Sequence, residues 1–433
     1  MKHFRRITAA SILSICLMFG FGSSVSALDW EWGGEIDNLT GYLSDDGGEV
    51  TQADRLSLWF EAEKKRGPST LGLHARASYL FTNERAYLLD LDELSFTGSF
   101  PGVLGQSSMV QTDVGRFAFS DPTGYILMHT ADGARLNFLF PRVHLKADAA
   151  YTGLLLNPSS DIRISSVDLS EQADEEGNSF GPERFFVQGQ LNFIDPGKRL
   201  LNWVFFGLAQ FDLREAEAGE ETIDSQYWGT LLSYKFGRFL FHDAFLIVGT
   251  SQISSVEDTE KLSLLTGFTS RYLRKDWLDS RFSLYGLAAT PDAPVEDIDI
   301  GFDMPFGLSK FRSMNKPSLG LVVDPTLDSL LYAGTSYSLR PFINGSSVLM
   351  QRLRPSLGGR VYFRIYEWNA DWMDLDGDTD SWFVGTEYDA GFTWDLTSDI
   401  STGLTGAVFI PGSAWNQNAE SDFMLRFKLT ARF

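Results

Sequence analysis

The feature that most constrains this chain is a strict alternation of apolar and polar residues, repeated in segments that turn-forming residues separate. Between residues 71 and 81 every odd-numbered position is apolar, while the even positions include His74 and Arg76. The same alternation recurs over residues 184–193 and 382–396. Successive side chains of a β-strand point to opposite faces, so each segment predicts a strand with one apolar and one polar face.

The last alternating segment reaches the final residue of the sequence. Its polar face carries Arg426, Lys428 and Arg432. Its apolar face includes Phe423, Leu425, Phe427, Leu429 and Phe433. This ending resembles the last strand of bacterial outer-membrane β-barrel proteins, which typically ends in Phe after alternating apolar residues. The resemblance implies that these five apolar residues form the signal read by the barrel-assembly machinery.

A membrane barrel also follows from the backbone. After residue 27 no apolar stretch is long enough for a spanning helix. In a bilayer every backbone N–H and C=O must be paired, which leaves only helices and closed barrels. We therefore predict one all-β domain over residues 28–433, a transmembrane antiparallel up-and-down β-barrel. We expect about 18 strands, with 16 or 20 as alternatives because residues 301–368 divide ambiguously.

The first 27 residues differ from the rest. Basic residues begin the chain, an apolar run covers residues 7–22, and small residues lead to Ala27. This pattern is typical of a secretory signal peptide, so we expect residues 1–27 to direct export to the outer membrane and cleavage to follow Ala27. A retained membrane anchor and a lipid on Cys16, the single cysteine, are the less favoured alternatives.

Composition excludes several classes of protein. Hydrophobic residues make up 43% of the chain and aromatic residues 14%, which excludes a disordered chain. The 36 basic against 57 acidic residues give a formal charge of -21, which argues against nucleic acid as a partner. Neither a phosphate-binding loop nor a dinucleotide fingerprint is present, so we expect no cofactor.

Charge also predicts the topology. Barrels of this class have short periplasmic turns and longer external loops. Acid-rich connections occur at residues 45–49, 168–176, 215–224, 257–260, 292–299 and 371–380. Wherever the strands between two such connections can be counted, their number is even. We therefore expect all six connections on the external side.

The polar face of the predicted barrel should line a water-filled lumen. The candidate pore-lining residues are Arg116, Arg135, Arg360, Arg364, Arg426, Lys428 and Arg432. The region around residues 114–135 is similar to porins in which the third loop folds into the barrel. That resemblance makes Asp121 and Asp132 candidate acids of a constriction loop facing the basic residues. The alternative is that these charges only fill a polar interior.

Catalytic and metal-binding signals are weak. Asp374, Asp376 and Asp378 resemble a calcium loop only loosely, because the position that needs glycine lacks it, and a solvated acidic loop is favoured. No histidine after residue 27 has a second one at metal-ligand spacing. We therefore expect neither a metal site nor an enzyme.

The sequence thus favours an outer-membrane channel, a porin, through which small hydrophilic solutes diffuse passively. The alternative is a surface-exposed structural or adhesion barrel with acidic external loops, and a barrel hydrolase is the third hypothesis. Outer-membrane lipid and small hydrophilic solutes are the expected partners. A monomer and a homotrimer both remain open, because an apolar flank buried in a trimer has the same sequence pattern as one facing lipid.

Overall fold

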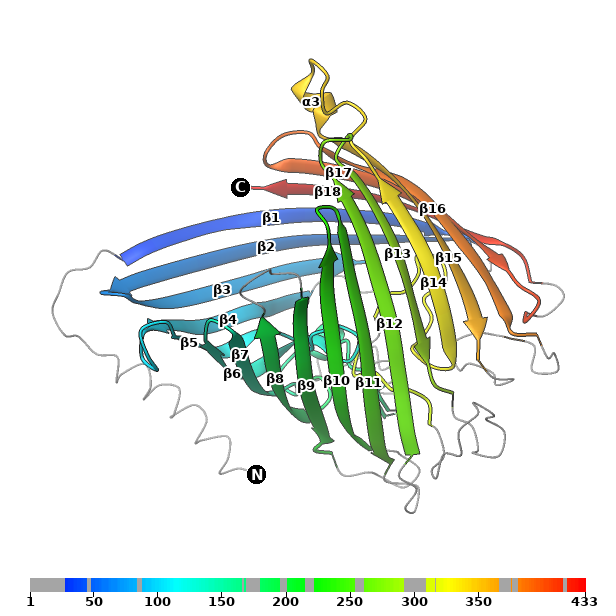
Figure 1. The fold of residues 1–433 in the computed structure, drawn as a ribbon. Coiled ribbons are helices and arrows are strands. Elements are labelled where there is room, and N and C mark those ends of the chain that lie inside the picture. The colour runs from blue at the N-terminus through cyan, green and yellow to red at the C-terminus, as the bar shows by residue number, and fades with distance from the viewer. Residues whose placement is uncertain are drawn as a thin grey trace.

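A computed structural model describes residues 28–44, 48–83, 88–165, 167–168, 180–194, 201–214, 222–253, 261–291, 309–315, 317–365, 375, 381–415 and 419–433. Within these residues the chain forms one sheet of 18 antiparallel strands (Figure 1). The strands are β1 (Leu28–Leu43), β2 (Glu49–Arg66), β3 (Ser69–Thr82), β4 (Leu88–Pro101), β5 (Met109–Ser120), β6 (Met128–Leu139), β7 (Val143–Tyr151), β8 (Arg184–Ile194), β9 (Leu201–Asp212), β10 (Ile223–Phe236), β11 (Leu240–Ile253), β12 (Lys261–Arg274), β13 (Ser280–Ala289), β14 (Leu330–Ser338), β15 (Leu353–Arg364), β16 (Phe383–Asp395), β17 (Ile400–Pro411) and β18 (Asp422–Arg432).

The sheet closes on itself. Each strand pairs with its neighbours in the sequence, and β18 pairs with β1 in a register that places Arg432 opposite Glu35. At the end of this seam the Gly34 N–H donates to the Phe433 carbonyl at 2.9 Å, and the Phe433 N–H donates to the Gly34 carbonyl at 3.0 Å. The predicted antiparallel up-and-down barrel and its count of 18 strands are confirmed.

The outer face of the barrel is apolar. Exposed side chains on it include Trp30 and Trp32 of β1 and Trp228 of β10. On β18 the residues of the expected assembly signal are all exposed and share this face: Phe423, Leu425, Phe427 and Leu429, with Phe433 following the strand. The predicted alternation is therefore confirmed, whereas recognition by the assembly machinery stays a prediction.

The two ends of the barrel differ. The end that holds Leu28 and Phe433, here called the turn end, has connections as short as residues 67–68 and 237–239. Gly237 takes a φ of +62°, a conformation that glycine adopts without steric cost. The connection of residues 339–352 is longer, contains the short helix α3 (Val348–Gln351), and projects from this end (Figure 1).

At the opposite end, here called the loop end, the connections are longer. In sequence, all six acid-rich stretches follow an odd-numbered strand and precede or run into the start of the next one. The predicted parity of the strands is thus confirmed. Among the residues that the structure describes, no helix is both long and apolar enough to cross a membrane.

Candidate functional site

Three segments from the loop end pack against the inner face of the barrel. Segment A is residues 121–127, segment B is the described part of residues 152–168, including the 3-10 turn η2 (Asn157–Ser159), and segment C is the described part of residues 309–324. They cover buried apolar residues whose side chains point inward from the wall. These wall residues include Phe206, Leu208, Tyr227, Ile247, Leu265, Leu287, Tyr332, Tyr362 and Phe409.

Segment A is stabilised by its own first residue. The carboxylate of Asp121 is buried and accepts hydrogen bonds from the backbone N–H groups of Thr123, Gly124, Ile126 and Leu127, at 2.7 to 3.1 Å. Asp121 therefore caps a turn and does not face the basic residues of the lumen. The expectation that it supplies a constriction charge is wrong, because its oxygens bind the backbone of its own loop.

The second expected constriction acid is also engaged elsewhere. Asp132 of β6 accepts from Arg116 of β5 at 2.8 and 3.1 Å. Arg116 pairs across the sheet with Leu94, an exposed outer-face residue, so its side chain has the parity of the outer face. The prediction that Arg116 lines the pore is wrong for this reason.

Arg116 instead joins strands that separate near the loop end. The ladder between β4 and β5 ends at the pair of Leu94 and Arg116, although both strands continue beyond it. There the guanidinium donates to the carbonyl groups of Leu91 and Leu154, at 3.1 and 2.9 Å, and lies 3.8 Å from the carboxylate of Asp90. Arg116 thus connects the end of β4 to segment B.

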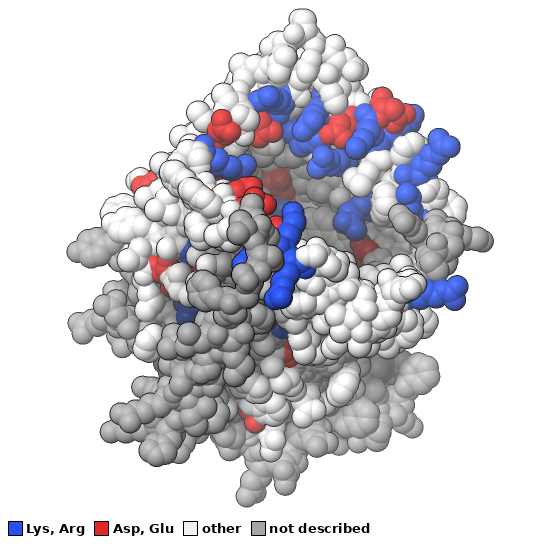
Figure 2. Space-filling view, turned by 90° about the vertical axis from the view of Figure 1, so that its left-hand side faces the viewer, with Lys and Arg blue, Asp and Glu red and all other residues white. Residues whose placement is uncertain are grey.

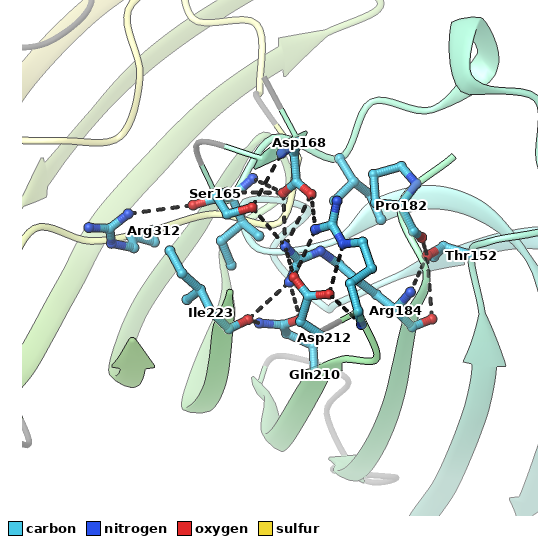
Figure 3. Close-up of polar contacts among 12 residues, drawn as sticks. Thr152, Ser165, Asp168, Pro182, Arg184, Gln210, Asp212, Ile223 and Arg312 are labelled. Atoms are coloured by element: carbon cyan, nitrogen blue, oxygen red, sulfur yellow. Dashed lines mark hydrogen bonds and ion pairs between the residues drawn. The ribbon is translucent and has the colours of Figure 1, made fainter. Parts of the chain in front are cut away.

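Segment B is tied to the wall by a buried ionic network (Figure 3). Arg184 of β8 is fully buried; its Nη2 lies 2.9 Å from Asp168 of segment B and 2.8 Å from Asp212 of β9. Its Nη1 donates to Gln210 and to the carbonyl of Ile223, at 2.9 and 3.0 Å. Buried charges need such partners, because an unpaired charge in a poorly hydrated interior costs several kcal/mol or more.

A second arginine completes this network. Arg214 follows β9 and pairs with Asp212 and Asp168. Burial alone would lower the pKa of Arg214, but the hydrogen bonds and charges of the two carboxylates outweigh it and raise the pKa. Two arginines therefore balance two buried aspartates, and segment B is fixed to the barrel by compensated charge.

Segment C is held by a carboxylate of the wall. Glu387 of β16 is fully buried, and its oxygens accept from the backbone N–H groups of Leu321, Val322 and Val323 at 2.9 to 3.2 Å. Arg360 of β15 lies 2.6 Å from the same carboxylate. Glu387 therefore holds three consecutive amides of segment C against the inner wall.

The three segments also bind one another across the interior. The Met314 N–H donates to the Ile126 carbonyl at 3.0 Å, and the Arg163 N–H donates to the Met314 carbonyl at 3.1 Å. The centre of the Tyr125 ring lies 5.1 Å from that of Phe245 on β11. Segment A follows β5, so this contact reaches a strand six places further along the sheet. The segments therefore form one layer that narrows the interior, over buried wall residues that extend from Phe117 of β5 to Phe409 of β17.

The wall from β17 through β18 and β1 to β3 has a different inner face. Arg426, Lys428 and Arg432 point inward, opposite to the apolar face of β18, and are exposed. Lys428 lies 3.5 Å from Asp37, and Arg432 lies 2.7 Å from Glu35. Among the described residues, Arg426 has neither an ion pair nor a hydrogen bond from its side chain. This part of the wall is thus charged and largely paired, and Arg426 is a cation without a partner among the described residues.

The remaining predicted basic residues point inward but are engaged. Arg135 pairs with Asp148 at 2.9 Å and lies over the ring of Phe117 at 4.9 Å. Arg360 pairs with Asp389 at 2.8 Å as well as with Glu387. Arg364 is buried and donates to the Ser381 carbonyl. The inward direction predicted for these residues holds, while their part in solute passage stays a proposal.

Residues Asp374, Asp376 and Asp378 lie outside the described residues. Within the described part of the chain, no group of three or more His, Cys, Asp or Glu side chains could hold a metal ion. The His242 Nδ1 lies 2.8 Å from the Ser270 Oγ, but no described carboxylate bonds to that histidine. This pair therefore lacks the third member of a Ser-His-acid arrangement.

Sequence reasoning missed the two groups that hold the loops. Arg184 begins an alternating strand, and Glu387 lies on the polar side of another. Their inward direction could be predicted, but their partners are 16 to 66 residues away in the sequence. The signal in the sequence is that each is a charged residue near the loop end of an otherwise apolar wall.

Comparison with known proteins places the fold. No protein-family model and no curated protein matches the sequence. Among solved structures from Pseudomonas aeruginosa, OpdO is 13% identical, with a TM-score of 0.59 over 94% of this chain and 97% of that one. OccK5 (OpdH) is 12% identical, with a TM-score of 0.58 over 94% and 98%. The outer membrane protein OpdK is 12% identical, with a TM-score of 0.56 over 94% and 98%. This chain therefore shares the closed β-barrel fold of these solved structures.

Proposed function

We propose that this protein is an outer-membrane channel through which small hydrophilic solutes diffuse passively. The observation that carries the proposal is the division of its interior. A barrel of 18 strands is too wide for the side chains of its wall to fill. The loop layer fills one side with apolar packing, while the wall from β17 to β3 keeps exposed charged side chains such as Arg426 and Lys428.

The charged wall supports a preference for polar solutes. Ion pairs such as Arg432 with Glu35 offer both signs of charge to a passing solute, and the unpaired Arg426 adds a positive field. Charged groups in a narrow, poorly hydrated passage act on solutes more strongly than they do in open water. The proposed passage therefore runs between the loop layer and the inner face of β17 to β3.

Export and assembly belong to the same proposal. Residues 1–27 would be removed after secretion, leaving residues 28–433 as the barrel. The apolar face of β18 would carry the signal for the assembly machinery, and outer-membrane lipid would contact the aromatic outer face. The anchor alternative is less favoured because a barrel that only anchors needs far fewer strands.

Single-channel recording tests the proposal. Mature protein folded in detergent is added to a planar bilayer under a tenfold salt gradient. We expect conductance steps of constant size and a nonzero reversal potential whose sign reports the dominant charge of the passage. A silent bilayer, with protein shown by circular dichroism and heat-dependent gel mobility to be a folded barrel, would reject the channel and favour the anchor.

A further inference from the structure

Three arginines converge on one carboxylate at the turn end of the barrel. Arg281 of β13 places its Nη2 3.6 Å from the Oδ2 atom of Asp279, and Arg340, which follows β14, places its Nε 3.7 Å from the same atom. Arg354 of β15 donates a hydrogen bond to that oxygen too. Figure 2 shows this end of the molecule hollowed, with Lys and Arg side chains gathered around the opening.

The cluster belongs to the inner wall. Arg281 shares its face of β13 with the buried residue Leu287, which packs beneath the loop layer. Arg281 pairs across the sheet with Ser338, and Arg354 lies on the same face of β15 as Ser356, the partner of Ser338. The guanidinium groups therefore lie where the lumen reaches the turn end.

The backbone holds the cluster in place. Leu278 and Asp279 take φ values of 53° and 46°, in the left-handed region that non-glycine residues seldom occupy. The Arg340 N–H donates to the Leu278 carbonyl at 2.7 Å, and the Arg354 Nη1 donates to the Asp279 carbonyl at 3.1 Å. The turn after β12 and the connection after β14 are thus bound together around Asp279.

The charges of the cluster do not balance. Three guanidinium groups face a single carboxylate, which leaves an excess of two positive charges. Arg354 is mostly buried and bonds to the turn, whereas the side chains of Arg281 and Arg340 are 53% and 35% exposed. Neither of these two side chains donates a hydrogen bond to any group in the described residues. Each guanidinium has five N–H donors in a planar fork that suits a carboxylate or phosphate group.

We propose that Arg281, Arg340 and Arg354 form a binding site for a small oxyanion with two negative charges, such as a phosphate or a dicarboxylate, at the turn-end mouth. Such an anion would neutralise the excess charge and accept the unused N–H donors. Only one part of this inference depends on the proposed channel: in a conducting channel, this site is the last one that a solute meets on its way inward. Binding itself does not require conduction.

The test compares phosphate binding to two variants of equal charge. Isothermal titration of the detergent-folded protein with inorganic phosphate, at constant ionic strength, should give saturable binding. In R281Q/R340Q the affinity should fall by at least about tenfold, because charge-assisted hydrogen bonds are lost. The control R274Q/R66Q removes two basic residues near the same end: Arg274 pairs with Asp276 outside the cluster, and Arg66 ends β2 on another part of the rim. It should bind like the parent.

The outcomes separate this site from the channel. Equal affinity in R281Q/R340Q and in the parent, or no saturable binding by the parent, would overturn the site even if the protein conducts. Saturable binding that only R281Q/R340Q loses would establish the site even if the bilayer is silent. Heat-dependent gel mobility must show that each variant is folded before its titration is compared.

Discussion

At the scale of single residues, Glu387 determines whether segment C stays on the wall. Replacing it by Gln removes the charge that three backbone N–H groups and Arg360 share. Hydrogen bonds to a charged group stabilise by about 2 kcal/mol, so we expect E387Q to weaken the attachment of segment C by that order. Hydrogen exchange of the amides of residues 321–323 should then become faster than in the parent.

A matched control separates this effect from the loss of any nearby acid. Asp389 also pairs with Arg360, at 2.8 Å, but accepts no hydrogen bond from the described part of segment C. D389N should therefore leave the exchange at residues 321–323 close to that of the parent. Equal acceleration in E387Q and D389N would show that Arg360, and not the carboxylate of Glu387, holds the segment.

The selectivity of the proposed passage should depend on Arg426. Its charge has no partner in the described residues, so R426Q removes a net positive charge from the passage. We expect the reversal potential under a salt gradient to shift toward cation preference. The paired variant E35Q/R432Q removes an ion pair and leaves the net charge unchanged, so its reversal potential should match the parent. A shift in E35Q/R432Q as large as in R426Q would contradict this assignment.

At the scale of elements, segments B and C are joined by a short antiparallel bridge between Ile162 and Asn315. The Arg163 N–H donates to the Met314 carbonyl, so the hydrogen bond lies beside the bridge, and Ile162 and Asn315 form a non-hydrogen-bonded pair. The Cα atoms of such a pair are about 4.5 Å apart. That separation permits a disulfide. We predict that I162C/N315C oxidises completely in the folded protein, although N315C loses the hydrogen bond that Met128 donates to Asn315.

The measurement is the number of reactive thiols in folded protein, and it is simplified because the sequence has a single cysteine, Cys16, which the mature chain would lack. Since the bridge would join segments already in contact, the single-channel conductance should differ little from that of the parent. Thiols that stay reactive under oxidising conditions would show that the two segments separate in solution.

At the scale of the whole molecule, the seam between β1 and β18 closes the barrel. A Cβ added at Gly33 would lie 2.6 Å from the ring of Trp59 and 2.8 Å from the Phe433 carbonyl oxygen, the acceptor of a seam hydrogen bond. Overpacking of this kind costs about 1 to 3 kcal/mol. We therefore expect G33A to lower the free energy of unfolding by that amount in urea titrations of detergent-folded protein.

Gly189 on β8 provides the control, because an added Cβ there meets no atom within 4 Å. G189A should be as stable as the parent or more stable by up to about 1 kcal/mol, since alanine restricts the unfolded chain. If G33A and G189A have equal stability, the fit of the seam does not limit the stability of the barrel.

The sequence by itself determined the barrel. A period of two fixes which face of each strand is apolar, and it does so from local residues alone, as on β18, where Phe423 and Arg426 were predicted on opposite faces. The strand count and the side of the acidic loops followed from the same pattern, because each antiparallel strand reverses the direction of the chain. Arg116 was misplaced because its apolar neighbours Phe117 and Phe119 face inward and are buried beneath the loop layer, so the apolar face of this part of β5 is the inner one.

The tertiary structure alone decided how the interior is divided. Asp121 and Asp132 could be predicted to lie near the lumen, but whether an acid faces solute or binds a backbone depends on groups brought together by folding. Asp168 lies in a stretch predicted to be an external acidic loop, yet it is buried against Arg184. A charged side chain is buried favourably only where folding brings oppositely charged or hydrogen-bonding groups from distant parts of the sequence into contact with it. No local pattern in the sequence predicts such contacts.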